Sequence, residues 1–361
     1  MINQKRIVEM WKRYGREGTL LLFFLWGMYL RFRLLASRDL WVDEVATLNV
    51  IKGPLKPFWL NVPLPAQLTA FPGQYILTWP FVQIFGDNKW AIMIPHILST
   101  VIGYYFLYRI CQRYFKRSLS YIIAFVLFSF NPELVFHSFE FREYAVLPTL
   151  SLAIFYFSEM LICQPMKLTL MQKWFVGFLF VSTVIYHAYG GMIIFLITLF
   201  FLLKEIRTRS VSEIWATSWR FYGSFCLIAL PIFVWYFMGS RAMGAAMWMD
   251  TFQFIPSPFM DLGGFLKAIF CNLTGHPKLY VLFVGIIFSF LIPHQNRWVQ
   301  MGFFLLLVIL PIELILLMDL SRSYWFLQRQ FVWITPLFLF FIGWCWDDVI
   351  GSFKNFLPSK R

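Results

Sequence analysis

Residues 19–37 read TLLLFFLWGMYLRFRLLAS, and two adjacent carboxylates, Asp43 and Glu44, follow soon after in LWVDEVATL at residues 40–48. The first stretch has the length and apolar character of a helix that crosses the hydrocarbon core of a membrane. It follows a basic N-terminus and ends without a small-residue cleavage site, so we predict an uncleaved membrane helix. A carboxylate pair beside such a helix is costly and therefore needs an explanation.

The composition of the whole chain extends this interpretation. The 361 residues are 60% hydrophobic and only 14% charged, far below the roughly 25% charged residues of a soluble domain. We therefore predict one all-α polytopic membrane domain over residues 1–361, with about ten transmembrane helices and with interfacial helices in the outer loops. The predicted spans lie near residues 19–37, 91–110, 119–132, 144–162, 174–188, 190–203, 221–239, 278–293, 300–318 and 330–346.

The positive charges predict the orientation of the chain. Most of the 31 lysines and arginines fall on one side if the N-terminus is cytoplasmic. We therefore place residues 1–18 and 347–361 in the cytoplasm. The long segments 38–90 and 240–277 then lie outside, where their proline breaks and amphipathic stretches indicate interfacial helices. Topology and contact with membrane lipids explain the net charge of +13, so we predict no nucleic-acid partner.

Four polar clusters fall on the predicted outer face, and LWVDEVATL is the first. Partial burial at the interface would raise the pKa of a carboxylate there toward the working range of a general base. An equally weighted alternative is a solvated pair that caps an interfacial helix.

The second cluster is NPELVFHSFEFREYAVLP at residues 131–148. If the following helix begins by Glu140, then Glu140 and Tyr144 share one face and Arg142 turns away from them. The planar fork of an arginine suits a pair of phosphate oxygens. The alternative is a local salt bridge among Glu140, Arg142 and Glu143. The acidic and basic side chains crowded into this turn also include Glu133 and His137.

The other two clusters are weaker signals. MDLSRSYWFLQRQFVWITP, at residues 318–336, places Arg322 and Arg329 among aromatic residues, and simple interfacial anchoring explains that pattern well. YHAYGG, at residues 186–191, places His187 in a tight turn and indicates a hairpin. The histidines and cysteines show no metal-ligand spacing, and no glycine-rich phosphate loop is present, so a nucleotide-binding module is not predicted.

The order of these motifs matches a known family. LWVDEVATL is followed by FPGQYILTWPFVQIFGDNKWAIMIPHIL at residues 71–98, then by the Glu-x-Arg-x-Tyr element, and RQFVWITPLFLF occurs at residues 329–340. The chain resembles the membrane-embedded GT-C glycosyltransferases. The likeness is in particular to the family 39 group, which includes protein O-mannosyltransferases and the bacterial aminoarabinose transferase of lipid A. The resemblance covers about the first 200 residues and the last span.

The resemblance implies roles for individual residues. Asp43 corresponds to the catalytic base, with Glu44 beside it. Glu140, Arg142 and Tyr144 correspond to an element whose arginine holds the lipid-linked phosphate. Donor contact is also implied for Arg329, and we place His137 with these substrate-binding candidates. The chain departs from many relatives at residues 71–73, which read Phe-Pro-Gly in place of His-Pro-Pro, and this makes acceptor recognition the least transferable property.

The resulting prediction is an inverting glycosyltransferase of the bacterial inner membrane, with its active site on the outer, periplasmic side. It would move a hexosyl or pentosyl group from a polyprenyl-phosphate donor to a hydroxyl of a glycan, lipid or protein acceptor. A divalent metal at Asp43 and Glu44 is left open, because carboxylates alone do not decide it. The alternative is a transporter or flippase of a lipid-linked or small solute, whose charged groups line a translocation path. A non-catalytic scaffold would leave a one-sided polar cluster without a purpose.

Overall fold

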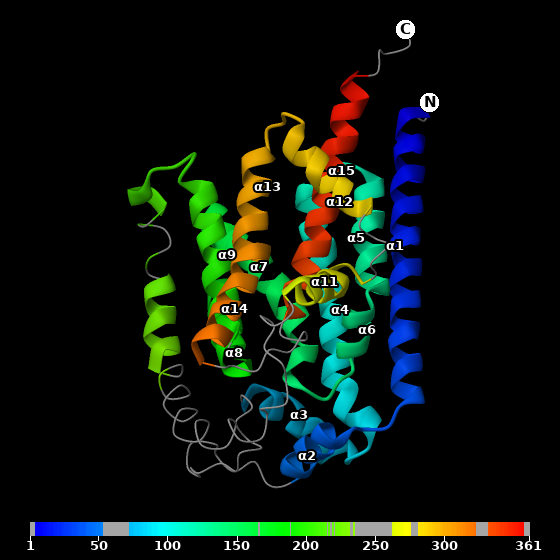
Figure 1. Cartoon of the computed structure of the whole chain (residues 1–361), viewed down its shortest axis with the longest axis vertical. Coiled ribbons are helices and arrows are strands. Elements are labelled where there is room, and N and C mark those ends of the chain that lie inside the picture. The colour runs from blue at the N-terminus through cyan, green and yellow to red at the C-terminus, as the bar shows by residue number, and fades with distance from the viewer. Residues whose placement is uncertain are drawn as a thin grey trace.

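The computed structural model describes residues 4–52, 72–164, 167–187, 189–214, 216, 219, 221–231, 234, 262–275, 281–322 and 331–356. These residues form helices and connecting turns, with no strand in the part described, so the prediction of an all-α fold is confirmed. Figure 1 shows the helices running mostly parallel to the long axis of the molecule. Long parallel helices are expected in lipid, because a helix satisfies its own backbone hydrogen bonds.

The helices coincide with the predicted spans, although their lengths differ. Among the described residues, four segments are long and apolar enough to cross a membrane, namely Tyr14–Ser37, Lys89–Tyr114, Arg297–Leu317 and Thr335–Phe353, so the predicted count of about ten transmembrane helices is not confirmed. Other predicted spans correspond to shorter apolar helices, among them the helix at 221–231. The helices are α1 (Gln4–Ser37), α2 (Val42–Ile51), α3 (Pro72–Phe85), α4 (Lys89–Tyr114), α5 (Ser118–Phe130), α6 (Pro132–His137), α7 (Leu147–Cys163), α8 (Leu170–Tyr186), α9 (Tyr189–Glu205), α11 (Leu262–Thr274), α12 (Val281–Leu291), α13 (Arg297–Phe304), α14 (Leu310–Arg322) and α15 (Thr335–Phe356), with the 3-10 turn η2 (Glu143–Ala145) and the π-helical η6 (Leu305–Ile309).

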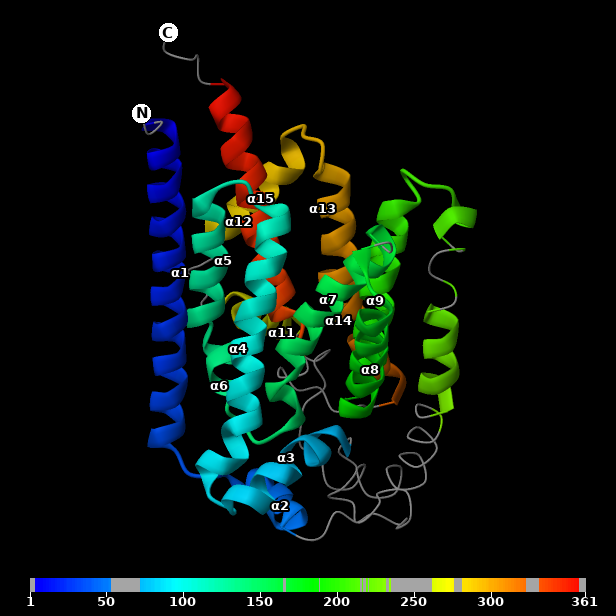
Figure 2. The same ribbon diagram turned by 180° about the vertical axis from the view of Figure 1, so that it is seen from behind.

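The two termini lie at the same end of the molecule, and α2 and α3 lie at the opposite end in both views (Figures 1 and 2). The predicted first outer loop therefore does contain helices, and it lies far from the termini. The second long loop contributes α11. Residues 240–261, 276 and 277 of this loop, and residues 53–71 of the first loop, lie outside the described part of the chain.

α5 and α6 meet at a break caused by Pro132. Because proline has no N–H group, the carbonyl of Phe128 cannot receive its usual helical hydrogen bond. The fully buried guanidinium of Arg31 in α1 donates to that carbonyl at 3.3 Å and to the carbonyl of Ser129 at 3.1 Å. It also donates to Ser138 Oγ at 2.9 Å. Arg31 thereby replaces bonds lost at the break and joins α1 to the chain that leads into the second polar cluster.

The end of the bundle that carries the termini is fixed by Asp347 of α15. Its buried carboxylate accepts hydrogen bonds from the backbone N–H of Arg117 at 2.8 Å and from Ser120 Oγ at 2.8 Å. It also forms an ion pair with the Arg117 guanidinium at 3.0 Å. A carboxylate at the first turn of α5 satisfies N–H groups that have no partner within the helix. This contact holds α15 against α5.

Candidate functional site

Glu44 is a fully buried carboxylate at the start of α2. Its Oε1 atom accepts from Arg38 Nη2 at 2.7 Å and from the backbone N–H of Phe141 at 2.6 Å. Its Oε2 atom accepts from Arg38 Nη1 at 2.9 Å and from the backbone N–H of Trp41 at 3.1 Å. Glu44 therefore does cap its helix, but it is buried and ion-paired. The alternative of a solvated carboxylate is wrong at this position.

The structure describes two of the predicted site residues, Asp43 and Arg329, less completely than Glu44. Asp43 is the second residue of α2, and only its backbone is described. Arg329 lies at 323–330, outside the described residues, so its contact with a donor stays a prediction. The role of Asp43 as a base likewise stays a prediction, now with its backbone placed next to Glu44.

The connection between α6 and α7 differs from the prediction. α7 begins at Leu147, so the expectation of a helix that begins by Glu140 is wrong. Pro148 explains the difference, because proline is accepted in the first turn of a helix but disrupts its interior. The intervening chain turns tightly, with the N–H of Glu140 donating to the carbonyl of His137 at 3.3 Å and that of Arg142 to the carbonyl of Glu140 at 2.7 Å. The expected shared helical face of Glu140 and Tyr144 therefore does not exist.

His137 lies between two carboxylates. Its Nδ1 atom contacts the buried Glu140 carboxylate, and its Nε2 atom lies 3.3 Å from Glu133 Oε2. Burial lowers the pKa of His137, but hydrogen bonds to Glu133 and Glu140 raise it by more, so the pKa lies above its ordinary value. α6 lies outside the four candidate spans, at the edge of the second cluster. The local pairing that the structure shows for Glu140 is thus with His137.

Tyr144 joins the second cluster to the YHAYGG turn. Its ring centroid lies 5.6 Å from that of His187 and 6.3 Å from that of His137. His187 Nδ1 is 3.0 Å from the backbone N–H of Tyr189, so that nitrogen accepts a hydrogen bond and the proton of a neutral ring sits on Nε2. The sequence predicted only a hairpin at YHAYGG. The feature that could have indicated a role for His187 in the site is its position beside tyrosines on the same predicted outer face.

Gly73 allows the first turn of α3 to pack closely against α8. A Cβ atom added at Gly73 would lie 2.5 Å from the Cα atom of Tyr186, which is too close for any side chain. The next residue, Gln74, is buried, contacts the hydroxyl of Tyr186 and lies 3.1 Å from His96 Nε2 of α4. The departure from the relatives' His-Pro-Pro therefore has a local reason, since Gly73 permits close contact between α3 and α8.

Replacing Gly73 by alanine should reduce the free energy of unfolding by about 1–3 kcal/mol, because a methyl group would force two backbones apart. Gly191→Ala is the matched control, since a Cβ atom at Gly191 meets nothing within 4 Å. Thermal unfolding of the two purified variants in detergent measures the difference. Equal transition temperatures for both would contradict this account of the α3 contact.

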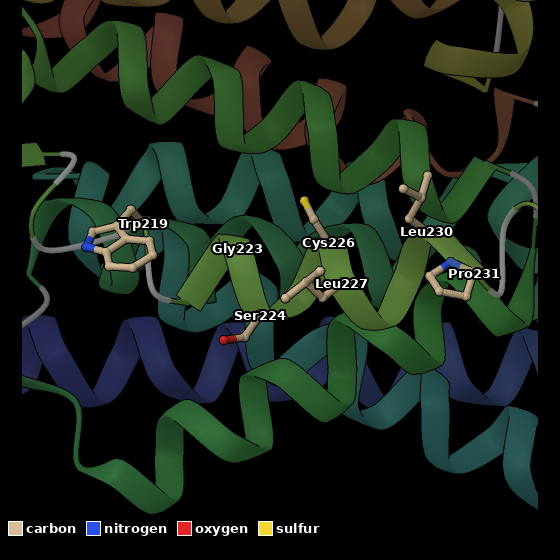
Figure 3. A pocket seen from close by; sticks show the side chains of 7 residues that line it. All are labelled: Trp219, Gly223, Ser224, Cys226, Leu227, Leu230 and Pro231. Carbon is tan, nitrogen blue, oxygen red and sulfur yellow. The ribbon is translucent and has the colours of Figure 1, made fainter.

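A separate groove of about 690 Å³ lies along the helix at 221–231 (Figure 3). This helix packs on α8 through contacts of Phe180 with Phe221 and Phe225. No charged side chain is present among the described residues that line the groove, so it lacks the groups needed for acid, base or phosphate chemistry. These lining residues are Trp219, Gly223, Ser224, Cys226, Leu227, Leu230 and Pro231.

Of the two carboxylates that could bind a metal, only Glu44 has a described side chain. Both of its oxygens are already occupied by N–H donors, so Glu44 does not fit the role of a metal ligand. Within the described part of the chain, no three His, Cys, Asp or Glu residues form a group that could hold a metal ion.

Residues 70–237 match the model of the dolichyl-phosphate-mannose-protein mannosyltransferase family. The match runs from the start of α3 past α9 and includes the Glu-x-Arg-x-Tyr element and the YHAYGG turn. No curated protein and no solved structure matches the chain. The resemblance found in the sequence is thus supported over this stretch, and the match indicates a membrane glycosyltransferase of the GT-C type.

Proposed function

Because the family match indicates a membrane glycosyltransferase, we propose that this protein transfers a sugar from a polyprenyl-phosphate donor to an acceptor hydroxyl, with inversion at the anomeric carbon. One observation carries the proposal. Glu44 accepts a hydrogen bond from the backbone of Phe141, so the carboxylate motif of α2 lies against the chain that leads to Arg142. Two motifs that are far apart in the sequence thus meet in one place.

In the proposed reaction, Asp43 accepts the proton of the acceptor hydroxyl as its oxygen attacks the anomeric carbon. A new carbon–oxygen bond forms, and the bond between that carbon and the phosphate oxygen breaks, with its electron pair leaving on the phosphate. Arg142 stabilises the charge that grows on the departing phosphate. Attack from the side opposite the leaving group inverts the configuration of the sugar.

The surrounding residues have supporting roles in this proposal. His137, which contacts both Glu133 and Glu140, contributes a polar side chain to the turn that leads to Arg142 and is assigned to the substrate-binding residues. Tyr144 packs between the rings of His137 and His187. In this proposal the three rings form the surface against which the donor binds. We also assign Arg329 a contact with the donor, because the resemblance to the glycosyltransferase family implies one.

We place the site on the outer face of a bacterial inner membrane, with the lipid tail of the donor between apolar helices. The positive charges of the sequence support this orientation. α2 lies at the end of the molecule opposite the termini, in agreement with it (Figure 1). The acceptor is a glycan, a lipid or a protein hydroxyl.

The competing function is transport of a lipid-linked or small solute. A transporter needs charged groups near the middle of the membrane, reachable from both sides. The cluster of Glu44, His137, Glu140 and Tyr144 instead gathers beside α2 and the end of α8, and α2 lies at the end of the molecule opposite the start of α1 (Figure 1). This one-sided placement favours transfer at a surface over passage through the bundle.

Mass spectrometry of cell-envelope glycans and lipid-linked sugars, with and without the gene, tests the proposal. We expect one sugar to disappear from an envelope component and its polyprenyl-phosphate form to accumulate when the gene is deleted. Restoring the gene should reverse both changes. An unchanged glycan profile in cells that express the protein would contradict the proposal and favour the transporter.

A further inference from the structure

The chain between His137 and Arg142 makes few helical hydrogen bonds, so its backbone depends on partners from other segments. Two of those partners come from one ion pair. Arg38 Nη2 donates to the carbonyl of Phe139 at 2.5 Å, and Glu44 accepts from the N–H of Phe141 at 2.6 Å. One arginine and one carboxylate thus fix two backbone groups of the turn that leads to Arg142.

Arg38 is held firmly for this task. Its two terminal nitrogens bind the two oxygens of Glu44, and one of them also donates to the carbonyl of Phe139. The side chain of Arg38 is only 19% exposed. Its own carbonyl accepts a hydrogen bond at 3.1 Å from Lys89, which also donates to the carbonyls of Leu35 and Ala36 at the end of α1.

We propose that Arg38 is a positioning residue for the transfer reaction. It holds the backbone at Phe139 and, through Glu44, the start of α2. The proposed base Asp43 and the proposed phosphate ligand Arg142 are thereby kept at a fixed separation. The inference rests on the proposed function, and it moves Glu44 from a catalytic role to the same positioning role, since all the bonds that Glu44 makes are structural.

The shape of the guanidinium is what this role requires. A lysine carries the same charge, but it presents a single nitrogen and cannot bind both oxygens of Glu44 in parallel while reaching the carbonyl of Phe139. Arg38→Lys therefore keeps a cation beside the buried Glu44 and removes only the fork. This avoids the large cost of leaving a buried carboxylate without a partner.

The test measures kcat, KM for the donor and thermal unfolding of the full-length protein reconstituted in vesicles, with a polyprenyl-phosphate sugar as donor. We expect Arg38→Lys to lower kcat about 10- to 100-fold, because small misplacements of reacting groups have effects of this size. KM and the unfolding temperature should change little. Arg33→Lys, the same substitution at an exposed arginine of α1, should leave all three values unchanged.

A double-mutant cycle separates positioning from general support of the fold. In an Asp43→Asn background the base is already lost, so Arg38→Lys should lower the residual rate by much less than it does in the wild-type protein. Equal effects in both backgrounds would overturn the proposal. A kcat for Arg38→Lys within twofold of the wild-type value would also overturn it. In that case the proposed function would still hold, provided that the wild-type protein transfers sugar. If the wild-type protein transfers no sugar from such donors, the proposed function fails and the inference fails with it.

Discussion

Replacing Asp43 by asparagine should reduce sugar transfer to a small residual rate while leaving the protein inserted and folded. Asparagine has nearly the shape of aspartate but cannot accept the proton of an acceptor hydroxyl, and loss of a general base lowers rates by about 100- to 10,000-fold. The start of α2 should persist, because its capping contacts are made by Glu44. The rate of transfer in reconstituted vesicles, compared at equal protein content, measures the effect.

Asp39→Asn is the matched control for this experiment. Asp39 is an exposed carboxylate in the same connection between α1 and α2, so its loss should leave transfer near the wild-type rate. Normal transfer by purified Asp43→Asn protein would remove Asp43 from the mechanism. Loss of transfer in both variants would instead indicate that negative charge in this connection matters in general.

Replacing Arg142 by alanine should lower kcat/KM for the donor by about 100- to 1,000-fold, the range found when one group that stabilises a developing anion is removed. Arg142→Lys should recover only part of this loss, because a lysine keeps the charge but cannot bind two phosphate oxygens with one planar fork. Inhibition by the polyprenyl phosphate product gives an independent measurement, since its binding should weaken in parallel.

The control for the second experiment is Arg207→Ala, which removes an exposed arginine from the turn after α9 at the other end of the bundle. Its kcat/KM should stay near the wild-type value. If Arg142→Ala binds the phosphate product and transfers sugar as the wild-type protein does, then Arg142 does not hold the donor phosphate. The assignment would then pass to His137 or Arg329 for testing.

The candidate site was only partly predictable from the sequence. The motif order pointed to the carboxylate pair and the Glu-x-Arg-x-Tyr element as parts of one site, and the contact between Glu44 and Phe141 brings them together. The conformation of the second element differs from the prediction, because Pro148 is accepted only in the first turn of α7 and so places the start of that helix at Leu147. Patterns of four-residue spacing are informative only inside a helix.

The role of Arg38 could not be seen in the sequence. It lies 101 residues from Phe139 along the chain, and nothing local distinguishes it from other arginines at the end of a membrane helix. The contact of His187 with Tyr144 is likewise not predictable from the sequence, because it depends on how α8 lies against the turn before α7.

The amino-acid sequence alone predicts that this chain forms apolar membrane helices, and it marks the polar motifs from which a site could be built. In lipid the backbone N–H and C=O groups of a segment must bond to one another, so a long apolar segment folds as a helix. The tertiary structure alone decided what each polar residue does. A carboxylate such as Glu44 is defined by the donors around it, and those donors come from Arg38 and from Phe141, which meet only when the helices pack.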